Sequence, residues 1–350
     1  MLQNNANMKE KGKHFSIKGS LFRFIRITLK QTATPFVLFR ARSVRKHNLI
    51  ESERRRKLSI FDTHELSSRL PYAAYHITHG MNIYSFFYSF TQYAGIKKIN
   101  SRYGIEHGLY FAAKGKKNSY EITFSDYREP ALMKAYSKAI KIGPYIHYAE
   151  PLLDDMAFTQ LKQYLGKVLL VFPIHSLDSF QATYDIQTFI DFVELHKTGY
   201  DTVMVCLHWK DFELNRDAVY KKQGYKVVTA GHPYDIYFLP RLKSIIGLSN
   251  MVVSNDIGTH LGYCIYMNKP VSIFFQPIEF KPGDSEKAFK KEINIRNPNE
   301  RKELHQIKER LSHLFGIFEE KITPEQYDEI SYLFGFDYIR DKEMLGKLLK

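Results

Sequence analysis

The chain has 350 residues, of which 44% are hydrophobic and 15% aromatic, and a formal net charge of +14 at pH 7. This length suits two packed domains, and the lack of any window near the ~18 unbroken apolar residues of a membrane-spanning helix argues against an integral membrane protein. Its two cysteines, Cys206 and Cys264, have neither metal-site nor CxxC spacing, so we expect inert core thiols.

The first segment, residues 1–69, is the most basic part of the chain. Arginine and lysine alternate there with Leu, Phe and Ile, in SLFRFIRITLK and PFVLFRARSVRK. This composition is typical of a helix in an anionic membrane interface; the alternative is a basic amphipathic helix packed on its own domain. The polar start is unlike a secretory signal, and no nucleic-acid-binding motif accompanies the charge. We therefore expect a cytoplasmic protein, peripheral on the inner face of the cytoplasmic membrane, without a nucleic-acid partner.

Residues 70–165 mix short apolar runs with helical stretches, which predicts an irregular α/β domain. Its most notable motif is the sequence YGIEHGL, in which Glu106 and His107 stand between Gly104 and Gly108. Glycines on both sides of an acid and a histidine predict a tight loop that presents one of them to a cleft, where either could deprotonate a hydroxyl. The alternative is a turn in which the two pair with each other or with a basic neighbour.

Residues 166–281 repeat a strand, a turn and a helix. Five β-rich runs alternate with helical patterns, and the runs VLLVF, TVMVCL and MVVS are almost continuously apolar. Such strands are typical of a parallel sheet that is covered on both faces, which predicts right-handed crossovers and a doubly wound domain. The tail, residues 282–350, is charged and helical in pattern, and we expect its helices to pack back on the domains.

Polar residues follow four of the five predicted strands. They are His175 with Ser176, His208 with Trp209, His232, and the run from Ser254 to Asp256. Ligands of doubly wound domains bind beyond the carboxyl ends of the strands. These residues are therefore the strongest indication of a site, although satisfied loop histidines are the alternative for His175.

The turn between the fourth strand and the next helix is suited to phosphate. Ser254, Asn255, Gly258 and Thr259 open that helix, and a helix N-terminus offers free N–H groups and the positive end of a dipole. An ordinary N-cap is the alternative. His232, between Gly231 and a proline, could hydrogen-bond a phosphate as a leaving group departs. No HxxxH motif or acidic cluster is present, so we expect no metal.

The order of these motifs resembles that of GT-B glycosyltransferases of bacterial surface polysaccharides such as capsule and lipopolysaccharide. The motifs are the EHG loop, the GHP sequence and the Ser-Asn turn followed by Lys-Pro, and they span residues 100–275. They are similar to motifs of sialyl- and Kdo-transferases, where an acid-acid-glycine motif supplies the base and an HP motif holds the nucleotide phosphate. Here Glu106 and His107 stand in place of the two acids, so the base stays open between them. Glycerophosphotransferases of teichoic acid synthesis are also similar.

This resemblance implies a GT-B architecture of two Rossmann-like domains with a cleft between them. Residues 70–165 would be the acceptor domain and residues 166–281 the nucleotide-sugar donor domain. The implied reaction moves a sugar, with a CMP-linked acidic sugar favoured, to a glycan or lipid-linked acceptor, and needs no cofactor besides the donor substrate. Glu106 or His107 would be the base, and His175, Ser176, His232 and the turn would bind the donor phosphate. A CDP-glycerol-type phosphotransferase and a nonenzymatic nucleotide- or glycan-binding assembly protein are the alternatives.

Overall fold

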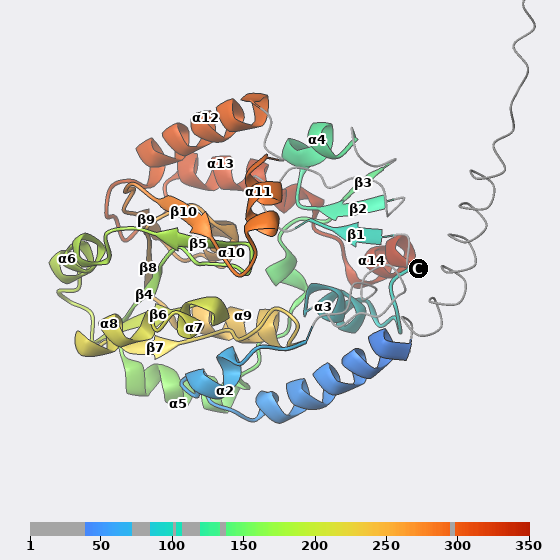
Figure 1. Ribbon diagram of the computed structural model, residues 1–350, viewed down its shortest axis with the longest axis horizontal. Helices are drawn as coiled ribbons and strands as arrows, with labels where there is room; N and C mark the ends of the chain where they lie inside the picture. The colour runs from blue at the N-terminus through green and yellow to red at the C-terminus, as the bar shows by residue number, and fades with distance from the viewer. Residues whose placement is uncertain (1–38, 72–84, 101–102, 107–119, 134–137, 295–297) are drawn as a thin grey trace, which may run out of the picture.

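The protein is a mixed α/β structure in which two units each contain a parallel sheet (Figure 1). The computed structural model describes residues 39–71, 85–100, 103–106, 120–133, 138–294 and 298–350. The α/β class expected from the sequence is confirmed by these two parallel sheets. Within the described ranges, no helix combines the length and the apolar character needed to cross a membrane.

The larger unit is built on a five-stranded sheet, and all five strands predicted from the sequence are present. The sheet order is β7-β6-β4-β8-β9, and every neighbouring pair is parallel. The strands are β4 (Val168–Phe172), β6 (Thr202–Cys206), β7 (Lys226–Val228), β8 (Met251–Ser254) and β9 (Val271–Ile273). All five carboxyl ends therefore lie along one edge of the sheet, which we call the carboxyl edge.

Both faces of this sheet are covered by helices, as its apolar strands require. Along β4, Leu169 and Val171 belong to one core cluster with α6, while Leu170 and Phe172 belong to another that includes α9 and α10. Successive side chains of a strand point to opposite faces of the sheet, so this alternation shows that β4 is buried on both sides. The covering helices are α5 (Asp155–Leu165), α6 (Ile186–His196), α7 (Trp209–Glu213), α8 (Asp217–Lys222), α9 (Phe238–Leu248) and α10 (Thr259–Tyr266).

The smaller unit has a three-stranded parallel sheet in the order β1-β2-β3. Its core is continuous with that of the larger unit, because Phe90 and Ile122 belong to the same cluster as Leu170. Its elements are α3 (Ser85–Ala94), β1 (Tyr103–Ile105), β2 (Tyr120–Thr123), η1 (Asp126–Arg128), α4 (Glu129–Met133), β3 (Ala139–Lys141) and η2 (Tyr145–Tyr148). Residues 39–56 form a helix along the lower edge in Figure 1, followed by α2 (Thr63–Ser67).

The C-terminal helices contact both units. The helix α13 starts with a capping box between Thr323 and Gln326 and packs on α10. The helix α14 packs on α3, and the Tyr103 hydroxyl donates to the carbonyl of Leu348 at 2.6 Å. The elements are β10 (Glu279–Pro282), which pairs with β5 (Phe180–Thr183), then α11 (Glu286–Asn294), α12 (Pro298–Phe315), α13 (Pro324–Phe334), η3 (Phe336–Tyr338) and α14 (Lys342–Leu349).

Candidate functional site

Four histidines gather at the carboxyl edge of the five-stranded sheet. The ring centroids of His175, after β4, and His208, after β6, are 4.7 Å apart. His232, after β7, lies 4.6 Å from Trp209, the residue next to His208. His260, in the first turn of α10, stacks on Phe172 at 4.9 Å. Three of these histidines were predicted from their positions just after the strands. His260 was not predicted, because it lies within a helix.

The protein keeps these imidazoles neutral near pH 7. Burial lowers the pKa of His232 and of His260 to about 3, and it lowers that of His208 well below its usual value. His175 keeps an exposed surface, and desolvation by the surrounding protein lowers its pKa to about 4. A neutral imidazole has one N–H donor and one acceptor, so each ring can donate one hydrogen bond to an anion.

The orientation of His232 is fixed by its own loop. Its Nδ1 lies 3.1 Å from the backbone nitrogen of Tyr234 and accepts that N–H. In the neutral ring, the proton is therefore on Nε2. Gly231, just before it, has φ +91°, and a Cβ there would lie 3.1 Å from the Leu66 carbonyl oxygen and 3.1 Å from an Arg241 nitrogen. Glycine at this position thus lets the chain pass close to α2 and α9.

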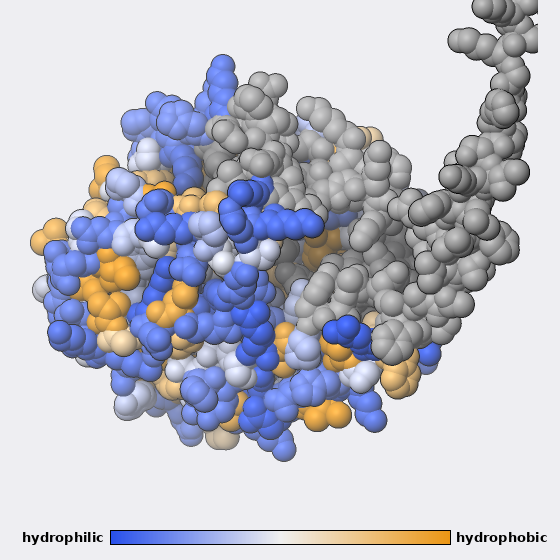
Figure 2. All heavy atoms as spheres, viewed as in Figure 1, coloured by the Kyte–Doolittle hydropathy of each residue, from blue (hydrophilic) through white to orange (hydrophobic). Residues whose placement is uncertain are grey.

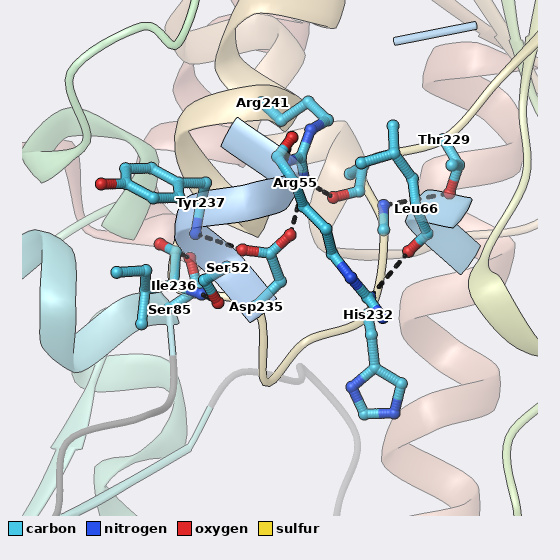
Figure 3. Close-up of polar contacts among 12 residues, drawn as sticks. Ser52, Arg55, Leu66, Ser85, Thr229, His232, Asp235, Ile236, Tyr237 and Arg241 are labelled. Atoms are coloured by element: carbon cyan, nitrogen blue, oxygen red, sulfur yellow. Dashed lines mark hydrogen bonds and ion pairs between the residues drawn. The ribbon is translucent and has the colours of Figure 1, made fainter. Parts of the chain in front are cut away.

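A buried ion pair and a buried arginine hold the same loop (Figure 3). Arg241 donates to the Asp235 carboxylate at 3.1 Å and to the Ala230 carbonyl at 2.7 Å, and both charged side chains are fully buried. Arg55, in the helix at residues 39–56, donates to the Leu66 carbonyl at 3.3 Å. Its own carbonyl lies 3.4 Å from a nitrogen of Arg241. The helix at residues 39–56 and α9 thus contact each other through Arg55 and Arg241, next to the loop that carries His232.

Two serines hold the chain just after this ion pair. The Ser52 hydroxyl accepts the N–H of Ile236 at 3.1 Å, and the Ser85 hydroxyl donates to the carbonyl of Ile236 at 2.9 Å. Figure 3 shows both serines on the side of Ile236. The loop that carries His232 is therefore attached to two elements that are distant in sequence, the helix at residues 39–56 and α3.

The turn after β8 contains the predicted phosphate-binding residues. Asn255 is fully buried, and its Oδ1 accepts the N–H of Ile174 at 2.6 Å, while its Nδ2 has no partner within the described structure. The helix α10 begins at Thr259 after Gly258, and no side chain caps it. The Nε2 of His260 is also buried without a partner there. An amide donor, an uncapped helix end and an imidazole thus lie within six residues of one another in the chain, at the carboxyl edge.

Two of the predicted residues, Ser254 and Ser176, form hydrogen bonds to the backbone of the protein itself. The Ser254 hydroxyl is 2.9 Å from the Phe172 carbonyl and 2.7 Å from the Asp256 carbonyl, so its hydrogen holds the turn to β4. Ser176 is fully buried, and its hydroxyl accepts the N–H of Ala182 at 3.2 Å. Their predicted contacts with phosphate stay predictions.

Lys308 reaches the same turn from α12. Its ammonium group lies 2.8 and 3.0 Å from the two carboxylate oxygens of Asp256, which is itself largely buried. A carboxylate beside the start of α10 would repel an anion, and this ion pair offsets that charge. No local sequence pattern indicates this pairing, because 52 positions separate the two residues.

The two predicted bases are in different situations. Glu106 is buried and accepts from Arg128 at 2.7 Å and from the Thr123 hydroxyl at 3.2 Å. Desolvation raises the pKa of Glu106, and the hydrogen bond and charge of Arg128 oppose that shift. His107 lies outside the described residues. In the described ranges, no group of three or more His, Cys, Asp or Glu side chains is arranged to hold a metal ion.

Comparison with known proteins gives only distant similarity. No family model matches the chain, and no curated protein matches it. Similar solved structures include the wall teichoic acid polymerase TagF, at 13% identity and TM-score 0.40 over 71% of this chain and 66% of that one. The UDP-GlcNAc 2-epimerase of Neisseria meningitidis, bound to UDP-GlcNAc, has 13% identity and TM-score 0.30 over 66% and 59%.

A third similar structure is the N-terminal domain of Candida albicans trehalose-6-phosphate phosphatase, at 12% identity and TM-score 0.28 over 66% of this chain and 57% of that one. The chain spans less than two thirds of the length of each of these three structures.

Proposed function

We propose that this chain is a glycosyltransferase that binds the phosphate of a nucleotide-linked sugar donor at the carboxyl edge of its larger sheet. The observation that carries the proposal is the side chain of Asn255. It is fully buried and its oxygen is engaged, while its Nδ2 has no acceptor among the described residues, and the uncapped start of α10 follows four residues later. A buried donor without a partner is costly, and an anion at a helix N-terminus would supply the missing acceptor.

The neighbouring histidines suit a departing phosphate. In the proposed reaction, the bond between the sugar's anomeric carbon and the donor phosphate oxygen breaks, and the acceptor oxygen bonds to that carbon. The released nucleotide gains negative charge, which His232 Nε2–H and the start of α10 stabilise by hydrogen bonding. Because these positioned donors would stabilise the charge on the released nucleotide, we propose that no metal and no further cofactor are needed. A CMP-linked acidic sugar is the donor we favour.

His107 is the base that we carry into this proposal. Both oxygens of Glu106 are already engaged with Arg128 and Thr123, so a proton would have to be taken up by a carboxylate inside an ion pair. A histidine has an ordinary pKa near 6.5 and exchanges protons readily at neutral pH. The acceptor proton would thus pass to the His107 ring as the new bond forms.

The acceptor side of the proposal rests on the helix at residues 39–56. Its exposed basic side chains flank two exposed apolar ones, Phe39 at 71% and Ile50 at 59% exposure. Figure 2 shows hydrophilic and apolar atoms mixed along the lower rim where this helix lies. The exposed basic residues are Arg40, Arg42, Arg45, Lys46, Arg54 and Arg56, and Lys57 directly follows the helix. We propose that this face rests on the anionic inner leaflet, where a lipid-linked surface glycan would be the acceptor.

A thermal-shift screen tests the donor site. The protein is heated with CMP, CDP, UDP, UMP, GDP or ADP, and a ligand at 100 times its dissociation constant stabilises the folded state by about 2.7 kcal/mol. We expect a clear rise in melting temperature with at least one nucleotide, and CMP would support an acidic-sugar donor. No shift with any nucleotide, for a folded sample, would contradict the proposal.

A further inference from the structure

Several buried polar atoms near the carboxyl edge have no partner within the described ranges. In the described ranges they include Nδ1 of His208, Nδ2 of Asn255 and Nε2 of His260. They also include both side-chain polar atoms of Gln276, the acceptor Oε1 and the donor Nε2. Native proteins leave few buried polar groups unpaired, and those that remain are often completed by a ligand or by water. Neither Gln276 nor His208 is among the proposed phosphate contacts, and only Gln276 leaves both a donor and an acceptor unpaired within the described ranges.

The position of Gln276 places it over this edge. It lies in the segment at residues 274–278, between β9 and β10. The segment starts beside the phosphate turn, because the N–H of Phe274 donates to the carbonyl of Ser254 at 2.8 Å. It ends in β10, which pairs with β5, and β5 follows His175 closely in the chain. The segment therefore runs from the end of β9 toward the strand pair that follows the histidine cluster.

The chain just before Gln276 is firmly held. The Phe274 ring stacks on Phe192 of α6 at 4.8 Å between centroids. The next residue, Phe275, packs against the other core cluster, which includes α10. Anchors on both faces of the sheet fix the backbone, so the carboxamide is presented from a rigid position. Such preorganisation favours selective hydrogen bonding.

We infer that Gln276 reads the hydrogen-bonding edge of the donor's nucleobase. The inference rests on the proposed function, since it assigns the base of the same nucleotide. A carboxamide presents an acceptor and a donor side by side, and the Watson–Crick edge of a nucleobase offers a matching donor and acceptor. A phosphate group offers acceptors only, so it could satisfy Nε2 and would leave Oε1 unpaired. The ligand that completes Gln276 therefore carries both kinds of group.

Binding of ligands with and without a base tests this inference. Dissociation constants of CDP, UDP, inorganic diphosphate and ribose 5-phosphate are measured by calorimetry for the full chain and for Gln276→Leu. We expect the variant to bind the better of the two nucleotides about tenfold more weakly, with the affinities for diphosphate and ribose 5-phosphate unchanged. Gln276→Met, which keeps the size and the neutral charge but lacks the N–H donor, should show the same selective loss. Gln223→Leu, at an exposed glutamine, is the matched control.

The possible outcomes separate the two proposals. Unchanged nucleotide affinity in both Gln276 variants would overturn the inference, and so would an equal loss for ribose 5-phosphate, which would indicate a contact with the sugar. Tighter nucleotide binding by the unaltered protein than by Asn255→Asp would support the donor site, even when the Gln276 substitutions leave nucleotide affinity unchanged. If the unaltered protein binds none of the four ligands, the proposed function and the inference fail together.

Discussion

Asn255 accepts the backbone N–H of Ile174 through Oδ1 at 2.6 Å, which ties the turn after β8 to the chain leaving β4. Because the oxygen is engaged in this way, the orientation of the carboxamide is set, and Nδ2 points away from Ile174. That nitrogen has no acceptor within the described structure. The same side chain thus joins two neighbouring strand ends and offers a donor at the edge of the sheet.

Replacing Asn255 with aspartate should reduce anion binding with little loss of stability. The carboxylate keeps the acceptor for Ile174 but removes the N–H donor and adds a negative charge beside α10. We expect affinity for inorganic diphosphate and for nucleotides to fall at least about tenfold. Calorimetry measures this loss, and Asn215→Asp, at an exposed loop position with φ +54°, is the control. Unchanged diphosphate binding in Asn255→Asp would rule out the proposed phosphate site.

Stability should fall as the pH is lowered from 7.5 to 5, and His232 should account for part of the loss. Its folded pKa of about 3 lies below the unfolded value near 6.5, so between these values the unfolded chain binds a proton that the folded chain does not. The free energy of unfolding therefore decreases as the pH falls below about 6.5, by about 2 kcal/mol at pH 5 from this residue.

Urea unfolding of His232→Gln at both pH values checks this prediction. Glutamine does not titrate, so the decrease between pH 7.5 and pH 5 should be smaller than in the unaltered protein by about 2 kcal/mol. His64→Gln, at an exposed position, should keep the original dependence. A His232→Gln variant with the full pH dependence would show that this imidazole is not held neutral by the fold.

The Asp235→Ala substitution should be strongly destabilising. It would leave Arg241, which is fully buried, without its carboxylate partner. Breaking a buried ion pair by removing one member typically costs about 3–5 kcal/mol, and urea denaturation measures it. Asp217→Ala, which removes the exposed pair with Lys221, should cost less than about 1 kcal/mol. A similar small effect for Asp235→Ala would mean that the pair does not support the His232 loop.

Membrane binding should depend on the exposed basic face of residues 39–56. Each lysine or arginine near an anionic surface contributes about 1 kcal/mol, so the triple change of Arg40, Arg42 and Lys46 to glutamine should reduce co-sedimentation with phosphatidylserine vesicles about 100-fold. Binding of the unaltered protein should also fall with added salt. The triple change of Lys221, Lys222 and Lys281, on other exposed surfaces, should have little effect. Salt-independent binding would contradict the proposal.

The larger sheet could be predicted from the sequence because each of its strands carries its own signal. VLLVF is apolar throughout and MVVS is apolar up to Ser254, since both faces of β4 and β8 are covered, and the helices between them show the helical period. The positions of His175, His208 and His232 just after β4, β6 and β7 then placed them on one edge without any knowledge of their distances. Local pattern and general topology were sufficient for these residues.

The rest of the site depends on pairings that a local pattern does not reveal. Arg55 meets Arg241 across 186 positions, and Glu106 meets Arg128 across 22. Nothing in the EHG motif distinguishes a carboxylate that faces a cleft from one that is held in an ion pair. Gln276 follows two phenylalanines and reads as an ordinary loop residue; only the burial of both its polar atoms makes it notable.

The contact between α14 and the smaller unit has a consequence for the order of folding during translation. Leu345 and Leu349 are fully buried, and Tyr103 donates to the Leu348 carbonyl. The ribosome makes β1 more than 200 residues before α14, whereas the strands of the larger sheet are complete at Ile273. The five-stranded sheet can therefore form on the nascent chain before α14 has been made. The smaller unit is made first, but its packing is complete only when α14 is present. During that interval the apolar side chains of α3 that α14 later covers are available to chaperones.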